Sequence, residues 1–242
     1  VFDRLSIQYL DSCKFGRYAC CGGWLSDVSY FYTTHPQALP WSNTNAAYAD
    51  VYSGCSSGAS SVDCDSISTS HHYPIQSITE QTIPTQGVGQ ATAIANIKNI
   101  LDQDKAVWLG YFLPNDAAWN DFYAFWNTQG ESALWDPDPY CGQDFGSGGA
   151  GHAVLCVGYN QDDPDPDNHY WIIVNSWGTA GGSRPNGIFR MKMNIDYDCR
   201  LPGVGAGDYA LYWQTLDIDW GDISPPKSTG WHLEAPIPQG LM

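Results

Sequence analysis

Two apolar runs decide the fold of this 242-residue chain: "GHAVLCVGYN" at residues 151–160 and "YWIIVNSWG" at residues 170–178. Both are rich in β-branched and aromatic residues, which predicts two buried strands joined by a short acidic loop. His152 then lies near the start of the first strand and Asn175 near the end of the second. A lone histidine beside an apolar strand is more often a core residue than a catalytic one, and the Asn-Ser-Trp-Gly sequence favours catalysis here.

The charge of the chain argues against two kinds of partner. Ten Lys and Arg stand against 26 Asp and Glu, a formal net charge of -16, so we expect neither a nucleic acid nor a membrane as partner. No stretch has the roughly 18 consecutive apolar residues of a membrane span. With 43% hydrophobic residues, the chain can bury a sizeable core in one large domain or in two lobes.

Cysteine usage predicts an exported protein. Eight cysteines, together with 25 glycines and 15 prolines, are typical of chains whose thiols pair in an oxidising or extracellular compartment. The closely spaced cysteines Cys20 and Cys21 are adjacent and cannot easily share one tetrahedral zinc ion. We therefore expect no metal site and no cofactor.

The order of the elements predicts an α+β protein. Helical patterns come first and strands dominate from residue 150 onward. We expect helices within residues 4–13, 24–35, 91–103 and 115–127, the last capped by Asn115 or Asp116, and strands within 106–114, 152–159, 170–177, 187–194 and 209–220. We expect residues 38–66 to be irregular chain held by cysteines. The domain prediction is 1–90 for part of a helical lobe, 91–220 for a β-rich lobe and 221–242 for an extended Pro-rich tail.

The two runs, followed by "NGIFRMKM" at residues 186–193, resemble in order and spacing the second lobe of papain-like cysteine peptidases. The resemblance implies a two-lobed α+β fold with a helical first lobe and a β-barrel-like second lobe, and peptide hydrolysis by a Cys-His-Asn triad. In that triad His152 would transfer the proton, Asn175 would orient the ring, and Trp177 would shield their contact from water. Physically, an imidazolium beside a thiol lowers the thiol pKa from about 8.5 by stabilising the thiolate.

The stretch "LSIQYLDSCKFGRYACCGGW" at residues 5–24 resembles the first lobe of the same family. In that family the paired glycines lie along the substrate cleft. The resemblance therefore implies that Gly22 and Gly23 contact the peptide backbone of the substrate and that Trp24 lies near the S2 pocket. The alternative is an ordinary tight turn. The candidate substrate-binding residues of the second lobe are Ala150, Gly151, Ala153 and Trp177.

The family's nucleophile precedes the Leu-Ser-x-Gln segment, which here begins at residue 5. The resemblance therefore implies a polypeptide substrate and a nucleophilic cysteine upstream of Val1, on a preceding segment or a second chain. Cys21 lies 131 residues before His152, a separation that would suit the nucleophile, but two glycines follow it where an activating helix should begin. The alternative function is a catalytically inactive papain-like module that serves binding or structural assembly.

By the same resemblance we expect the disulfides Cys13–Cys55 and Cys141–Cys199, with Cys21–Cys64 as an additional bridge. Cys20 would pair upstream, and Cys156 would be a buried free thiol. The loop "QDDPDPDN" at 161–168 carries four carboxylates within six residues, but their spacing misses the EF-hand pattern. This favours a solvated loop over a calcium site.

Overall fold

The computed structural model describes residues 4–14, 22–50, 60–177, 184 and 186–221. The chain divides into two compact units, which we describe separately. The first comprises residues 1–79 and 216–242, and the second comprises residues 80–215. The Pro-rich tail predicted at 221–242 lies outside the described residues except for Gly221.

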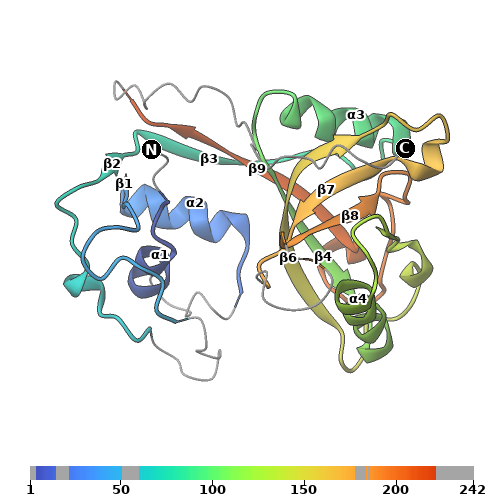
Figure 1. The fold of residues 1–242 in the computed structure, drawn as a ribbon, viewed down its shortest axis with the longest axis horizontal. Coiled ribbons are helices and arrows are strands. Elements are labelled where there is room, and N and C mark those ends of the chain that lie inside the picture. Colours follow the sequence, from blue (N-terminus) through green and yellow to red (C-terminus); the bar gives the residue numbers. More distant parts are fainter. Residues whose placement is uncertain (1–3, 15–21, 51–59, 178–183, 185, 222–242) are drawn as a thin grey trace. The chain divides into compact units, whose positions relative to one another are not determined.

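The first unit is built from short elements and irregular chain (Figure 1). Its helices and strands are α1 (Ile7–Cys13), α2 (Leu25–Thr34), the 3-10 helix η3 (Cys64–Ser66), β1 (Gln37–Ala38) and β2 (Tyr73–Pro74). β1 and β2 pair antiparallel. One small core gathers Tyr9 of α1 and Phe31 of α2, whose rings meet edge to face with centroids 5.3 Å apart. The predicted helices at 4–13 and 24–35 are therefore present, each a few residues shorter.

The second unit is a sheet with two main helices, seen in Figure 1 above and below its strands. Its helices are α3 (Gln90–Leu101) and α4 (Asp116–Thr128), with 3-10 turns η4 (Asp138–Tyr140), η5 (Pro166–Asn168) and η6 (Ala206–Asp208). Its strands are β4 (Val107–Leu113), β5 (Leu134–Trp135), β6 (Ala150–Asn160), β7 (Tyr170–Val174) and β8 (Ile188–Lys192). β3 (Ser77–Thr82) and β9 (Leu211–Asp219) cross the boundary between the units. The sheet order is β3-β9-β4-β6-β7-β8-β5.

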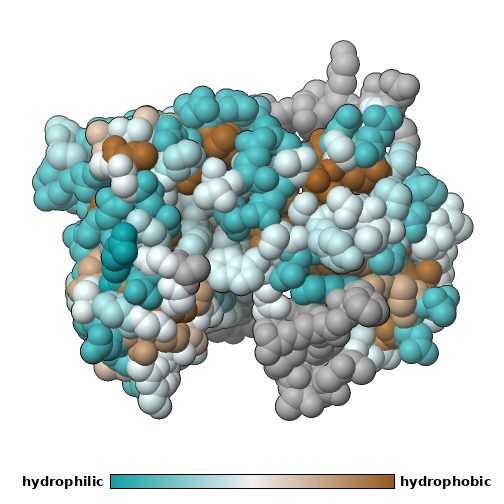
Figure 2. All heavy atoms as spheres, turned by 180° about the vertical axis from the view of Figure 1, so that it is seen from behind, coloured by the Kyte–Doolittle hydropathy of each residue, from teal (hydrophilic) through white to brown (hydrophobic). Residues whose placement is uncertain are grey.

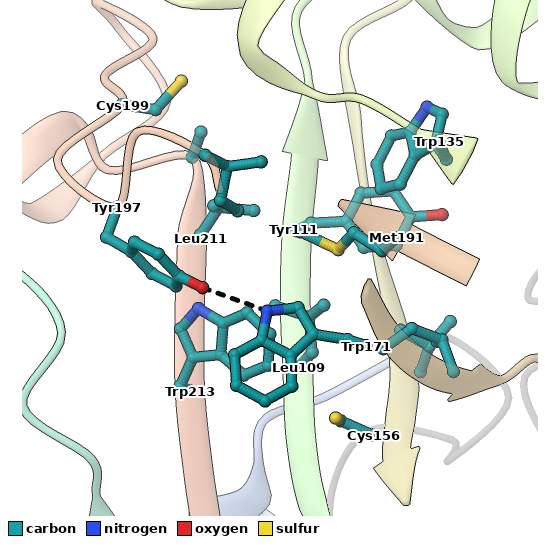
Figure 3. Close-up of a cluster of buried hydrophobic side chains, with 14 of the residues drawn as sticks. Leu109, Tyr111, Trp135, Cys156, Trp171, Met191, Tyr197, Cys199, Leu211 and Trp213 are labelled. Atoms are coloured by element: carbon teal, nitrogen blue, oxygen red, sulfur yellow. Dashed lines mark hydrogen bonds between the residues drawn. The ribbon is translucent and has the colours of Figure 1, made fainter. Parts of the chain in front are cut away.

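Aromatic side chains fill the interior of the second unit (Figure 3). Trp171 of β7 is fully buried and donates its indole N–H to the Tyr197 hydroxyl at 3.0 Å. Tyr197 in turn donates to the Met193 carbonyl at 2.9 Å, so the buried polar groups of this pair are bonded. Burial of rings this large is the main stabilising contribution to a core of this kind.

These elements confirm the predicted α+β fold class. The helix N-cap at Asn115 is also confirmed, since its side chain accepts a hydrogen bond from the Ala118 N–H at 3.0 Å. None of the helices in the described part of the chain is long and apolar enough to cross a membrane. Figure 2 shows a face on which hydrophobic residues form small groups among hydrophilic ones.

Candidate active site

His152 is placed by the pairing of β6 with β4. The two strands are antiparallel, and His152 lies directly opposite Tyr111. Side chains alternate along a strand, so His152 shares the core-facing side of β6 with Val154 and Cys156, while Gly151 is exposed on the other side. Because it lies near the start of the strand, the imidazole is half-buried rather than enclosed.

Asn175 is the first residue after β7, where the strand gives way to a turn. Its backbone N–H donates to the Gly187 carbonyl at 2.8 Å, and Gly187 donates to the Arg184 carbonyl at 2.9 Å. Only 5% of Asn175 is exposed. The strand end and this turn therefore fix the backbone of Asn175, independently of its side-chain contact with the histidine.

The two side chains meet in a hydrogen bond. The distance from His152 Nε2 to Asn175 Oδ1 is 2.9 Å. An amide oxygen can only accept, so Nε2 carries the proton and donates, which leaves Nδ1 free to exchange a proton with another group. A neutral amide fixes the tautomer in this way without adding a charge.

Aromatic rings surround this pair. The Trp177 ring lies over the imidazole with centroids 4.9 Å apart, and 37% of Trp177 remains exposed. Tyr123 of α4 stacks on the outer part of Trp177 at 5.3 Å. Trp177 thus covers the imidazole and joins it to an exposed aromatic surface.

Burial lowers the pKa of His152, and the hydrogen bond to Asn175 opposes that shift. Desolvation disfavours the imidazolium, so the isolated ring favours its neutral, proton-accepting form. A thiolate placed beside Nδ1 would act in the opposite direction, because a negative charge stabilises the imidazolium. The site as described is therefore set to accept a proton.

The residues that flank His152 along β6 are small. Ala150, Gly151 and Ala153 are exposed. A Cβ atom on Gly151 would come within 2.7 Å of the Phe112 ring, so the ring lies directly against the glycine backbone. The side of β6 opposite the imidazole consequently offers an open surface of small residues.

The substrate-binding residues predicted in the first unit lie before α2. Gly22 has a φ of 81°, in the left-handed region that favours glycine. A Cβ on Gly23 would come within 2.7 Å of Asp27 Oδ2, the same oxygen that accepts from the Trp24 N–H at 2.8 Å. The backbone conformation thus favours glycine at residue 22, whereas a side chain at residue 23 would displace the Asp27 carboxylate, and Trp24 is 43% exposed beside them.

The disulfide predictions are partly wrong. Cys13 bonds Cys64, with their Cα atoms 4.9 Å apart, so neither Cys13–Cys55 nor Cys21–Cys64 forms. The reason is that the 3-10 turn η3 brings Cys64 against the end of α1, a position that the irregular sequence 38–66 does not reveal. Cys20, Cys21 and Cys55 themselves lie outside the described residues.

Two further cysteine predictions, for Cys141–Cys199 and for Cys156, are confirmed. Cys141 bonds Cys199, with Cα atoms 5.1 Å apart. Cys156 is a buried free thiol, and burial raises its pKa to about 12. Such a thiol is inert as a nucleophile at neutral pH.

The acidic loop at 161–168 is exposed and forms one wall of a hollow of about 550 Å³. The carboxylates of Asp162 and Asp163 and the guanidinium of Arg190 contribute to its lining. Among the residues that the structure describes, no group of three His, Cys, Asp or Glu side chains is arranged to hold a metal ion.

Sequence reasoning missed three aromatic residues of the site: Tyr111, Trp119 and Tyr123. Tyr111 and Trp119 contact the imidazole and Tyr123 contacts Trp177. For Tyr111 and Trp119, the signal that could have found them is their periodic placement in the strand and helix predicted at 106–114 and 115–127; Tyr123 is 45% exposed, so this pattern does not mark it. That pattern identifies core positions without identifying which of them face His152.

Comparison with known proteins gives one family. Residues 132–204 match the family model described as papain family cysteine protease. The chain is 27% identical over 203 residues to cathepsin B-like CP2 of Giardia intestinalis, covering 82% of this chain and 55% of that protein. It is 28% identical to cathepsin B-like CP3 of the same organism, covering 85% of this chain and 58% of that protein. The chain thus spans little more than half the length of these curated relatives.

Solved structures support the fold. The proform of Amb a 11, a ragweed pollen cysteine protease and allergen, matches with a TM-score of 0.53 at 18% identity, covering 90% of this chain and 54% of that one. The SERA5 proenzyme of Plasmodium falciparum matches with a TM-score of 0.53 at 17% identity, covering 90% and 53%. The predicted papain-like fold and the resemblance to papain-like cysteine peptidases are confirmed.

Proposed function

We propose that the protein is a cysteine peptidase in which His152 and Asn175 are two members of a Cys-His-Asn triad. The observation that carries this proposal is the 2.9 Å hydrogen bond from Nε2 of His152 to Asn175 Oδ1, which leaves Nδ1 available for proton exchange with a thiol. In the proposed reaction a thiolate attacks the peptide carbonyl, and the imidazolium then gives its proton to the leaving amine.

The nucleophile is proposed to come from residues that precede Val1 in the complete protein, or from a second chain. Cys156, the free thiol within the described residues, is buried and has a raised pKa, so it does not suit the role. The similarity to longer relatives, of which the match covers 55% and 58%, is compatible with a nucleophile outside residues 1–242.

Substrates are proposed to be polypeptides with an apolar side chain beside His152. Ala150, the small residue two positions before His152 on the same side of β6, leaves room there, whereas Gly151, Ala153 and Phe112 lie on the opposite side of the strand pair. Gly22, Gly23 and Trp24 are proposed to contact the same substrate, in line with the family resemblance. The disulfides support an oxidising or exported location, because such bonds persist there.

The test is peptide hydrolysis by the complete protein and by two variants. His152→Ala should lower kcat/KM by about 1,000-fold or more, because both proton transfers use this ring. Asn175→Ala should lower kcat more than it changes KM. His169→Ala is the matched control, since its ring bonds the Asp163 carbonyl at 2.8 Å in the acidic loop, and it should keep full activity.

Two results would contradict the proposal. Unchanged turnover in His152→Ala would remove the histidine from the mechanism. A complete, folded protein that hydrolyses no peptide and has no cysteine at the nucleophile position would instead be an inactive binding or assembly module.

A further inference from the structure

We propose that Tyr111, with Trp119 stacked against it, is a positioning residue for His152: its ring fixes the plane of the imidazole from the core side and excludes water from that side. The role rests on the proposed peptidase function, because positioning matters for a histidine that transfers protons.

Strand register brings the two rings together. Tyr111 and His152 are opposite partners in the β4–β6 pair, so both side chains leave the sheet on the same face. Their centroids are 5.5 Å apart and their planes meet at 88°. This edge-to-face arrangement is one that aromatic pairs prefer. Turning the imidazole out of its plane would bring it into contact with the Tyr111 ring.

Tyr111 cannot move aside, because its own surroundings are closely packed. Only 1% of it is exposed. Trp119 of α4 stacks on it at 6.2 Å and also meets the imidazole edge to face at 6.3 Å. Trp135 also contacts Tyr111, with ring centroids 4.9 Å apart. Figure 3 shows these two rings next to each other. The ring that limits the imidazole is therefore itself fixed by rings from α4 and β5.

The aromatic ring of Tyr111, and not its hydroxyl, positions His152. The Tyr111 hydroxyl is buried and has no hydrogen-bond partner among the described residues, so it does not hold His152. Burial raises its pKa well above the usual range, with Tyr123 adding to the shift, so it is uncharged. A buried, unbonded hydroxyl costs free energy, and its removal should not harm the site.

Among the described residues, the side chains that contact the imidazole on the core side are uncharged. β4 and α4 bring two phenols to this cluster, Tyr111 and Tyr123, and β7 leads to the neutral amide of Asn175. The carboxylate of Asp116 at the start of α4 lies against Gly148 instead. Exclusion of water by the rings is thus the main reason that burial lowers the pKa of His152.

The experiment is an NMR titration of histidine-labelled complete protein, combined with kinetics across pH. In Tyr111→Leu water reaches the inner side of the imidazole, so the His152 midpoint should rise by about 0.5 pH unit or more. The acid limb of the kcat/KM profile should move with it. Loss of fixed geometry should lower kcat by about 10-fold with little change in KM. Tyr111→Phe should titrate and turn over like the unaltered protein.

Phe189→Leu is the matched control for loss of a core ring. Phe189 is fully buried, contacts Phe122 and Trp135, and makes no ring contact with His152. The Phe189→Leu protein should be less stable than the unaltered protein, and the midpoint of its His152 titration should be unchanged. If Tyr111→Leu does not fold, Tyr111→Met is measured in the same way.

An unchanged midpoint in the folded Tyr111 variants, or an equal shift in Phe189→Leu, would overturn the inference. The titration reads the imidazole directly, so it decides the role of Tyr111 at this ring even if the protein cleaves no peptide. Absence of cleavage in the unaltered complete protein would contradict the proposed function separately.

Discussion

Buried amide and carboxylate groups organise much of the first unit, whereas aromatic rings organise the second. In the first unit, Gln8 of α1 donates to Asp50 Oδ2 at 2.7 Å and to the Ser60 hydroxyl at 2.7 Å, and it accepts from the Ala49 N–H at 2.7 Å. In the second, Trp171, Trp213 and Tyr111 are almost completely buried.

The two units are therefore expected to lose stability in different ways. A core of rings loses stability through cavities, at any pH. A network that converges on a buried carboxylate depends on bonding geometry and on the charge of that carboxylate. The three predictions below separate these two modes, beginning with the largest expected effect.

Trp171→Ala should destabilise the second unit by about 3–5 kcal/mol, because it leaves a cavity and removes the donor to Tyr197. The measurement is denaturant unfolding with hydrogen exchange, in which β6 and β7 should lose protection. Trp41→Ala is the control, since Trp41 is 45% exposed in the first unit, and it should change stability by about 0.5 kcal/mol or less. Equal effects of the two substitutions would show that burial of rings does not distinguish the units.

Replacing both Cys13 and Cys64 with serine should destabilise the first unit by about 3–4 kcal/mol. The bond closes a loop with a sequence separation of 51 residues, and its removal frees the unfolded chain. Protection from hydrogen exchange should fall in α1 and η3 and remain in β4 and β6. Peptide mapping under non-reducing conditions is the companion test, and recovery of a Cys13–Cys55 peptide would contradict the pairing described here.

Much of the second unit could be predicted from the sequence, because its signals are local. Alternating apolar residues identify β6 and β7, and a short polar side chain before an amphipathic run identifies the cap at Asn115. The positions of His152 and Asn175 at strand ends followed from the same patterns. Their meeting could be inferred only from the family resemblance, since strand register is set by pairing partners.

The rest depends on contacts between distant residues. β3 has the sequence "SITEQT", whose pattern is weak, and it forms a strand because β9 lies beside it in the sheet. The partner of Cys13 is decided by where η3 lies against α1, within a segment of Ser and Gly that carries no periodicity. Tyr111 could be recognised as a core residue, but only the β4–β6 register shows that it faces His152.

Asp50→Asn should destabilise the first unit by about 1–3 kcal/mol at neutral pH, and the effect should become smaller in acid. Burial alone would raise the pKa of Asp50, but hydrogen bonds from Ser61, Gln8 and Ser60 outweigh it and hold the pKa well below its usual range. A carboxyl group whose pKa is lower in the folded state stabilises the fold above its unfolded pKa of about 3.9, and this stability is lost as pH falls through the folded value.

The measurement is the difference in unfolding free energy between the unaltered protein and Asp50→Asn from pH 7 to pH 2. The difference should be constant down to about pH 5 and then shrink, because below about pH 4 the unfolded chain binds a proton at Asp50 while the folded carboxylate resists protonation, and the asparagine variant has no such group. Asp65→Asn, in the exposed first turn of η3, controls for the general effect of removing one negative charge. A difference that stays constant to pH 2 would mean that the carboxylate charge contributes nothing to the first unit. The Gln8–Asp50 network would then stabilise that unit through shape and neutral hydrogen bonds, in the same pH-independent way as the rings of the second unit.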